Sequence, residues 1–320
     1  MKNEKVLILG ACGQIGVELS IALRKAYGNN NVVATDIQAE HHLLKGTGPF
    51  YNLNVMDAPA ILAMIKKEEI TQIYLLAALL SATGEKDPMR AWDINMKSLL
   101  QVLDMAVQEK LTRVYWPSSI AVFGPTTPRD NTPQQTIVEP RTVYGISKYA
   151  GELWCQYYRQ RYGLDVRSLR YPGLISWKGE PGGGTTDYAV DIYYEALQKG
   201  HFTCFLSENT YLPMMYMDDA IRGTIELMEA PLEKVKLTMA YNIGAISFSP
   251  KEIAASIQKH IPDFKIDYAP DFRQQIADGW PKSIDDSAAR ADWGWQHDFD
   301  LNRMSNDMLI HLKDKLELAV

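Results

Sequence analysis

The stretch LILGACGQIGVEL, residues 7–19, places three glycines between an aliphatic run and an amphipathic segment. The aliphatic run has the composition of a buried β-strand, and the apolar residues after it recur at helical spacing. Gly10, Gly13 and Gly16 would therefore lie in a tight strand-to-helix turn, where a missing Cβ lets other groups approach the backbone closely. The first N–H groups of the helix favour a bound phosphate at this point. The spacing G-x-x-G-x-x-G thus predicts a dinucleotide-binding unit.

The first half of the chain repeats this alternation of strand and helix. Strands are predicted over 5–10, 31–36, 72–78, 113–119 and 165–171, and helices over 14–26, 61–69, 93–110 and 144–162. Regular alternation predicts a parallel sheet that is covered by helices on both faces. We therefore expect an α/β protein with a doubly wound Rossmann sheet.

The alternation stops after Tyr171. A glycine-rich loop over 175–188 comes first, followed by a short strand and a helix within 212–229 and a late strand within 239–245. Another helix is expected to begin at Pro250, with Ser249 as its N-cap. We predict two interwoven parts: a cofactor-binding domain made of 1–173 with 213–246 returning to it, and a smaller C-terminal substrate lobe made of 174–212 and 247–320.

The composition excludes several classes of protein. The 320 residues are 46% hydrophobic and 22% charged, as in ordinary globular proteins, and the net charge of −6 argues against nucleic acid or an anionic membrane as the partner. No apolar run approaches the roughly 20 residues of a membrane helix, and the start does not resemble a signal or transit peptide. Cys12, Cys155 and Cys204 are widely spaced, which favours a reducing, cytoplasmic setting. The histidines form no ligand cluster, so no metal site is expected.

Asp36 identifies the expected cofactor more closely. It ends the second predicted strand, where a carboxylate can accept hydrogen bonds from an adenosine ribose 2′-hydroxyl and would repel a 2′-phosphate. We therefore predict NAD rather than NADP, with Asn54 or Val55 near the adenine. The residues expected to contact NAD are Gly10, Gly13, Gln14, Ile15, Gly16, Asp36, Ile37, Asn54, Val55, Leu76, Ala77, Ala78, Asn95, Lys148, Tyr171, Gly173 and Leu174.

Tyr144 and Lys148 stand four residues apart in TVYGISKYAGE, on one face of a predicted helix. Beside NAD, the ammonium and the nicotinamide cation would favour the phenolate and move the pKa of Tyr144 toward the working pH, so that the tyrosine can act as a base. Lys148 could also hold the nicotinamide ribose. Ser118 and Ser119, at the end of the fifth predicted strand, offer a hydroxyl to orient an alcohol substrate; Ser119 is favoured and Ser118 stays open as the alternative.

These motifs resemble the extended short-chain dehydrogenase/reductase superfamily, which includes nucleotide-sugar epimerases and dehydratases. Within it, segments from end to end of the chain resemble the short-chain-type L-threonine 3-dehydrogenases. The segments are WPSSIAVFGP, YGISKYAGELW, RYPGLISW, GGGTTDYAVDIYYEAL, LPMMYMDDAIRGTIELM, YNIGAISFSP and DDSAARADWGW. GGGTTDY is the most specific of them. Gly173 stands where many epimerases carry Asn, and the C-terminal part has no arginine-rich segment for a nucleotide diphosphate.

The resemblance implies oxidation of the β-hydroxyl of L-threonine to 2-amino-3-ketobutyrate. Tyr144 would take the hydroxyl proton, Ser119 would bind the same oxygen, and Lys148 would hold cofactor and phenolate. By the same resemblance, the substrate residues are Ser81, Ser119, Tyr144, Gly184, Thr185, Thr186 and Trp280. Trp280 would close the pocket and exclude water.

Three further expectations remain open at this point. Gly182, Gly183 and Gly184 would form a hinge for closure over the substrate. The helices over 93–110 and 144–162 would pair with those of a second copy in a homodimer, as in relatives. The alternative functions are a nucleotide-sugar epimerase or reductase, an NAD-sensing regulator without activity, and, disfavoured by the absent Cys/His cluster, a metal-dependent threonine dehydrogenase.

Overall fold

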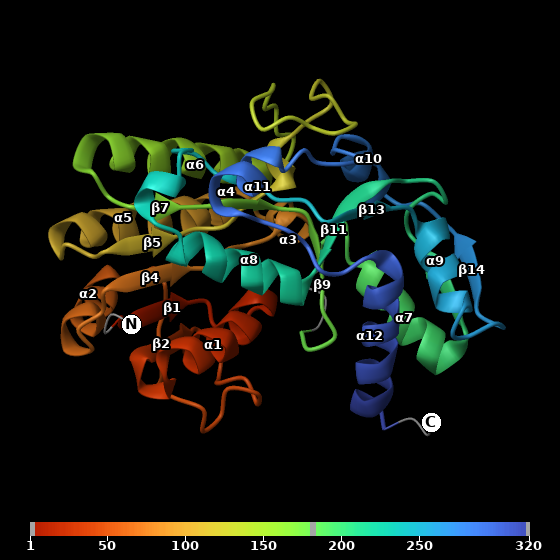
Figure 1. Ribbon diagram of the computed structural model, residues 1–320, viewed down its shortest axis with the longest axis horizontal. Helices are drawn as coiled ribbons and strands as arrows, with labels where there is room; N and C mark the ends of the chain where they lie inside the picture. Colours follow the sequence, from red (N-terminus) through yellow and green to blue (C-terminus); the bar gives the residue numbers. More distant parts are fainter. Residues whose placement is uncertain (1–3, 180–183, 318–320) are drawn as a thin grey trace.

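The computed structural model describes residues 4–179 and 184–317, and its centre is a parallel sheet (Figure 1). Within these residues the sheet has six strands in the order β3-β2-β1-β4-β5-β7. Their bounds are β1 Val6–Leu9, β2 Val32–Asp36, β3 Phe50–Asn52, β4 Gln72–Leu75, β5 Arg113–Tyr115 and β7 Val166–Arg167. β1 pairs with β2 on one side and β4 on the other, so the winding reverses beside β1, as predicted for a doubly wound Rossmann sheet.

Helices cover both faces of this sheet. The bounds are α1 Gln14–Tyr27, α2 Ala58–Lys67, α5 Ser98–Gln108, α6 Val143–Tyr162 and α8 Met217–Glu229. Val6 and Ile8 of β1 pack with α1 and α8, whereas Leu7 and Leu9 pack with α2, α5 and α6. Alternate residues of a strand point to opposite faces, so an unbroken aliphatic run is what a strand buried on both sides requires.

Two of the predicted strands are interrupted at the same level of the sheet. Where single strands were expected over 113–119 and 165–171, the structure has β5 followed by β6 (Ser118–Ser119), and β7 followed by β8 (Leu169–Tyr171). Pro117 lacks an N–H for the ladder, which ends β5. Beyond the break, β6 and β8 pair with each other and β8 pairs with β12 (Tyr241–Asn242). The break carries the serines beyond the main sheet.

The remaining described elements either connect this sheet or build the smaller lobe. The short elements are η1 Asn29–Asn31, α3 Ser81–Gly84, α4 Pro88–Trp92, the π-helical η2 Asp93–Lys97, η3 Ile120–Val122, η4 Leu232–Lys234, α10 Arg273–Asp278 and α11 Ser287–Trp293. The lobe contains β9 Gly173–Ile175, α7 Tyr188–Lys199, β10 His201–Cys204, β11 Leu212–Tyr216, β13 Ile246–Phe248, α9 Pro250–Gln258, β14 Lys265–Tyr268 and α12 Leu301–Lys315. No described helix combines the length and apolarity of a membrane span.

The lobe surrounds its own hydrophobic core, in which α7, α9 and α12 pack together. α7 was not predicted from the sequence, although Asp191, Glu195 and Lys199 recur along it at helical spacing. The predicted N-cap is confirmed, since the Ser249 hydroxyl accepts from the backbone N–H of Glu252 in a capping box.

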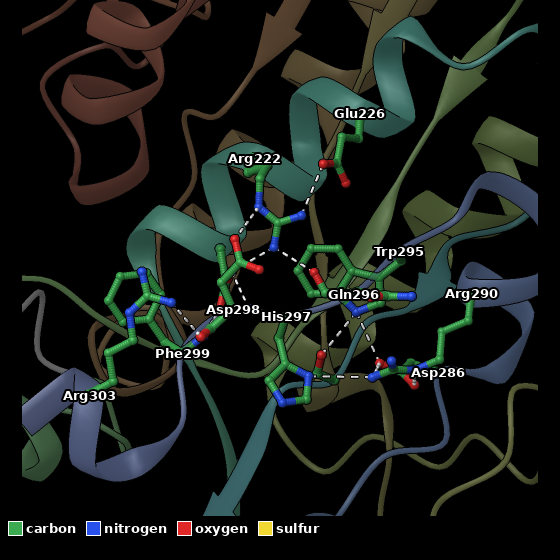
Figure 2. Close-up of polar contacts among 12 residues, drawn as sticks. Arg222, Glu226, Asp286, Arg290, Trp295, Gln296, His297, Asp298, Phe299 and Arg303 are labelled. Atoms are coloured by element: carbon green, nitrogen blue, oxygen red, sulfur yellow. Dashed lines mark hydrogen bonds and ion pairs between the residues drawn. The ribbon is translucent and has the colours of Figure 1, made fainter.

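The link between α11 and α12 is fastened to α8 by a buried carboxylate. Asp219 accepts hydrogen bonds from the N–H of Asp298 at 2.9 Å and from the Arg222 guanidinium at 2.7 Å. Figure 2 shows the same guanidinium reaching Glu226 and the backbone of Gln296. The C-terminal segment is thereby tied to the Rossmann domain before α12 enters the lobe.

The glycine turn gives a test of packing. A Cβ on Gly16 would lie 2.3 Å from the Gly10 carbonyl oxygen, whereas one on Gly13 would lie 3.6 Å from it. We expect Gly16→Ala to lower the free energy of unfolding by about 1–3 kcal/mol because the turn must open. Gly13→Ala is the matched control and should cost clearly less. Equal midpoints of thermal unfolding for the two variants would contradict this account of the turn.

Candidate functional site

A cleft opens beyond the carboxyl ends of β1, β2 and β4, where the winding reverses. Its outer hollow, of about 300 Å³, lies against β2, and its inner hollow, of about 150 Å³, lies over β6 and α6. Leu76 and Ala78 line both hollows, so the two adjoin. Ligands of open α/β sheets bind at this kind of topological switch point.

The predicted cofactor residues divide between the hollows. On the outer hollow lie Gly10, Gly13, Asp36, Ile37, Asn54, Val55, Leu76, Ala77 and Ala78. On the inner hollow lie Gln14, Ile15, Leu76, Ala78, Lys148, Tyr171, Gly173 and Leu174. Gly16 and Asn95 line neither one. Gly16 closes the turn, and Asn95 bonds both backbone groups of Leu79, a residue of the outer hollow, at 2.8 and 3.1 Å.

Asp36 is held rigidly at the end of β2. One carboxylate oxygen accepts from the N–H of Cys12 and the other from the N–H of Gln38, each at 2.9 Å. The first bond joins β2 to the glycine turn, so the carboxylate and the phosphate-binding turn keep a fixed relation. This arrangement fits a dinucleotide whose adenosine ribose meets a carboxylate and whose pyrophosphate meets the helix N-terminus.

The glycine turn also presses against the next strand end. Gly10 has φ +94°, and a Cβ on it would lie 2.6 Å from the backbone nitrogen of Ala77. The floor of the cleft is therefore bare backbone, which a pyrophosphate can approach.

Tyr144, Lys148 and Ser119 meet in the inner hollow. Ser119 is near enough to the Tyr144 phenol to lower its pKa, and the ammonium nitrogen of Lys148 lies 5.5 Å from the centre of the Tyr144 ring. Ser118 also lines the hollow, but its hydroxyl donates to Glu152 Oε1 at 2.5 Å. Of the two candidate serines, Ser119 is the one that faces the tyrosine.

Burial is the main influence on the pKa values of Tyr144 and Lys148. Burial raises the pKa of Tyr144 to about 12, and Ser119 lowers it only in part. Burial also lowers the pKa of Lys148 to about 7. In the protein alone only burial and Ser119 shift the pKa of Tyr144, so the expectation that the ammonium and the nicotinamide cation together bring the phenol toward the working pH stays a prediction.

The predicted substrate residues also line the inner hollow: Ser81, Ser119, Tyr144, Gly184, Thr185, Thr186 and Trp280. Thr185 is 1% exposed and its hydroxyl has no hydrogen-bond partner among the described residues. A buried hydroxyl of this kind costs free energy unless a ligand satisfies it. Gly173 lets the loop come close, since a Cβ there would lie 2.7 Å from Thr186. The expected hinge residues Gly182 and Gly183 lie outside the described residues.

Sequence reasoning missed two charged residues of the cleft. Asp187 lines the inner hollow, where its carboxylate accepts from the N–H of Gly184 at 2.7 Å. It directly follows Thr186, and recognising α7 would have placed it at a helix start that faces the site. Arg90, on α4, lines the outer hollow, and no local signal marks it. No cluster of His, Cys, Asp or Glu suited to a metal ion occurs in the described part of the chain.

Comparisons with known proteins agree with this geometry. The model of the NAD dependent epimerase/dehydratase family matches residues 6–244. An uncharacterized epimerase/dehydratase of Staphylococcus haemolyticus is 49% identical over 98% of each chain. The holo form of a GalE-like L-threonine dehydrogenase from Cupriavidus necator is 56% identical, with a TM-score of 0.95 over 97% of this chain and all 100% of its own. A monomeric L-threonine 3-dehydrogenase from a metagenome is 45% identical, with a TM-score of 0.93 over 97% of this chain and 99% of its own.

The fixed carboxylate predicts how the cofactor is selected. We expect Asp36→Asn to weaken NADH binding about tenfold or more, since hydrogen bonds to a charged group contribute about 1.5–3 kcal/mol. The ratio of NADH affinity to NADPH affinity should fall as well. Titration of NADH fluorescence measures both affinities. Asp93→Asn, an exposed carboxylate outside the cleft, is the control. Unchanged NADH affinity in Asp36→Asn would show that the ribose lies elsewhere.

Proposed function

Since this chain belongs to the NAD-dependent epimerase/dehydratase family, we propose that it oxidises the β-hydroxyl of L-threonine to 2-amino-3-ketobutyrate with NAD. The observation that carries the proposal is the inner hollow, which Tyr144, Ser119 and Lys148 line together with Thr185, whose buried hydroxyl has no partner among the described residues. The proposal is also supported by solved relatives of nearly the same fold and length that are L-threonine dehydrogenases. The three free cysteines suit a cytoplasmic enzyme.

The substrate loses a proton and a hydride to two different acceptors. Tyr144, as phenolate, takes the proton of the β-hydroxyl, and Ser119 donates a hydrogen bond to the same oxygen and aligns it. Bound NAD supplies the nicotinamide carbon that accepts the hydride from Cβ. Lys148, as ammonium, stabilises the phenolate and holds the nicotinamide ribose. Each neighbouring positive charge favours the phenolate, which must form although burial alone opposes it.

Other residues of the hollow suit the amino acid's charged groups. Ser81, Thr185 and Thr186 offer hydroxyls to the carboxylate, and the Asp187 carboxylate offers oxygens to the ammonium. Trp280, only 8% exposed, walls the hollow and keeps water out. Binding of the carboxylate and the ammonium by these residues would orient the substrate so that its β-hydroxyl faces Tyr144.

We also propose that the loop closes over the substrate by motion around Gly184. The substitution Gly184→Pro would not test this motion alone. The N–H of Gly184 donates to Asp187, and proline would remove this bond together with any hinge motion. Gly184→Ala keeps the N–H. Its Cβ would meet a carboxylate oxygen of Asp187 at 3.0 Å, a contact at the end of a side chain, which can adjust.

The second candidate is a nucleotide-sugar epimerase or reductase, which the family description also covers. NADH formation with a panel of β-hydroxy amino acids, set against turnover of UDP-sugars, separates the two. An NAD-binding protein that turns over neither class would instead be a regulator.

The tyrosine gives the direct test of the mechanism. We expect Tyr144→Phe to lower kcat with L-threonine about 100-fold or more, because loss of general base catalysis costs about that much, while NADH affinity stays unchanged. Tyr149→Phe, which alters a half-buried tyrosine outside the cleft, is the matched control and should keep the wild-type rate. Turnover that survives Tyr144→Phe would remove this residue as the base.

We also propose that two copies associate through α5 and α6. α6 exposes large apolar side chains along one face: Ile146, Leu153, Trp154, Tyr157 and Tyr162 are each 40–50% exposed. Packing this face against its copy would remove it from water.

A substitution on that face tests the dimer. We expect wild-type protein to have the mass of a dimer by light scattering and Trp154→Glu to be monomeric, because a buried unpaired carboxylate opposes association. Phe272→Glu, on an exposed aromatic of another surface, should remain a dimer. A monomeric wild type, as in the metagenome relative, would refute the proposal.

A further inference from the structure

Beneath the catalytic pair, α6 carries a carboxylate with no access to solvent. Glu152 is 0% exposed and lies one helical turn after Lys148. Arg170 of β8 binds both of its oxygens, Nε to Oε1 at 2.8 Å and a terminal nitrogen to Oε2 at 2.7 Å. A buried ion pair usually adds little to the free energy of unfolding, because desolvation offsets most of the attraction. Its other contacts indicate what this pair does.

One of these contacts leads to the serine that orients the substrate. Ser118 donates to Glu152 Oε1 at 2.5 Å, and the next residue, Ser119, lines the inner hollow with Tyr144 and lowers its pKa. Successive residues of a strand point to opposite sides, so anchoring Ser118 below the strand fixes Ser119 above it. β6 has only two residues and begins after the break at Pro117, so the main sheet does not hold it.

Glu152 also lies one helical turn from Lys148, and both side chains are buried on α6. Lys148 donates to the carbonyl oxygen of Pro117 at 2.6 Å and lies 4.4 Å from the centre of the Trp116 ring. Burial lowers the pKa of Lys148, while Cys155 and the carboxylate of Glu152 raise it. Burial also raises the pKa of the Cys155 thiol, so this thiol is uncharged near neutral pH. Tyr144 is the other titratable group facing it, and Arg170 lies beyond Glu152. Glu152 is the charged group that favours the ammonium.

We infer that Glu152 is a positioning residue for the proposed reaction: it fixes Ser119 through Ser118 and keeps Lys148 charged beside Tyr144. The inference rests on the proposed function for its kinetics. Arg170 serves as the counter-ion that lets a carboxylate be buried there, and it joins the pair to Asn242 of β12 at 3.1 Å.

Two variants separate the two actions. Glu152→Gln keeps the shape and an oxygen for Ser118 but removes the charge, so Lys148 loses its proton more readily and the phenolate forms less readily. The acid limb of kcat/KM should move to higher pH by about one unit, a tenfold change in rate on that limb. Ser118→Ala keeps the charge and releases the strand. It should lower kcat about tenfold or more through misplacement of Ser119, with the pH limb, KM and NADH affinity unmoved.

Asp219→Asn is the matched control for the loss of a buried ion pair. Asp219 is 1% exposed and pairs with Arg222, and neither residue lines the inner hollow. The variant should unfold at lower temperature with the wild-type pH limb. If Asp219→Asn and Glu152→Gln shift the acid limb of kcat/KM equally, Glu152 has only a structural role. The same conclusion follows if Glu152→Gln leaves this limb unmoved. Should Glu152→Gln fail to fold, an unchanged kcat in Ser118→Ala would overturn the inference by itself.

A spectroscopic reading distinguishes this inference from the proposed function. Tyrosinate absorbance of the NAD-bound protein, taken as the difference from Tyr144→Phe, titrates the phenol without turnover. A midpoint that rises in Glu152→Gln supports the inference even if the wild type fails to oxidise L-threonine, which would refute only the function. Activity with L-threonine and an unmoved midpoint would refute only the inference.

Discussion

Lys148 carries an amine in a place with almost no water, and much of the site follows from that constraint. The residue is 3% exposed, and a buried cation is costly unless other groups replace its solvent. The carbonyl of Pro117 and the Trp116 ring do so in part. Gly151 makes this possible, because a Cβ there would lie 2.3 Å from the Trp116 ring. A larger residue would push α6, and the lysine with it, away from the strand end.

The break in the sheet connects this constraint to the substrate. Pro117 ends β5, turns its carbonyl to Lys148, and begins the segment that carries Ser118 and Ser119. The lysine, the two serines and the carboxylate of Glu152 thus depend on one irregularity of the backbone. An unbroken strand would have kept its carbonyls in the ladder and would have left Lys148 without an acceptor.

The sequence predicted what local spacing determines. The glycine turn, Asp36 and the Tyr144–Lys148 pair each depend on one turn or one helical repeat, and the structure brings them to one cleft. Strand alternation implied that only one of the two serines faces the tyrosine, but which one depends on the register of β6 against β8. Arg170 and Glu152 belong to different elements, and neither local pattern nor composition pairs them. The raised pKa of Tyr144 likewise reflects burial, which only the assembled fold reveals.

The charges of the inner hollow bear on the class of substrate. Among its described lining residues Lys148 is the cation and Asp187 the carboxylate, Gln14 carries an amide, and the rest are hydroxyl or apolar. A nucleoside diphosphate would bring two or more negative charges, for which arginine forks are the usual partners, and would need more room than about 150 Å³. An amino acid brings one charge of each sign, on two groups attached to the same carbon. A hollow with one carboxylate, several hydroxyls and a base matches that pattern, and it favours a β-hydroxy amino acid over a nucleotide sugar.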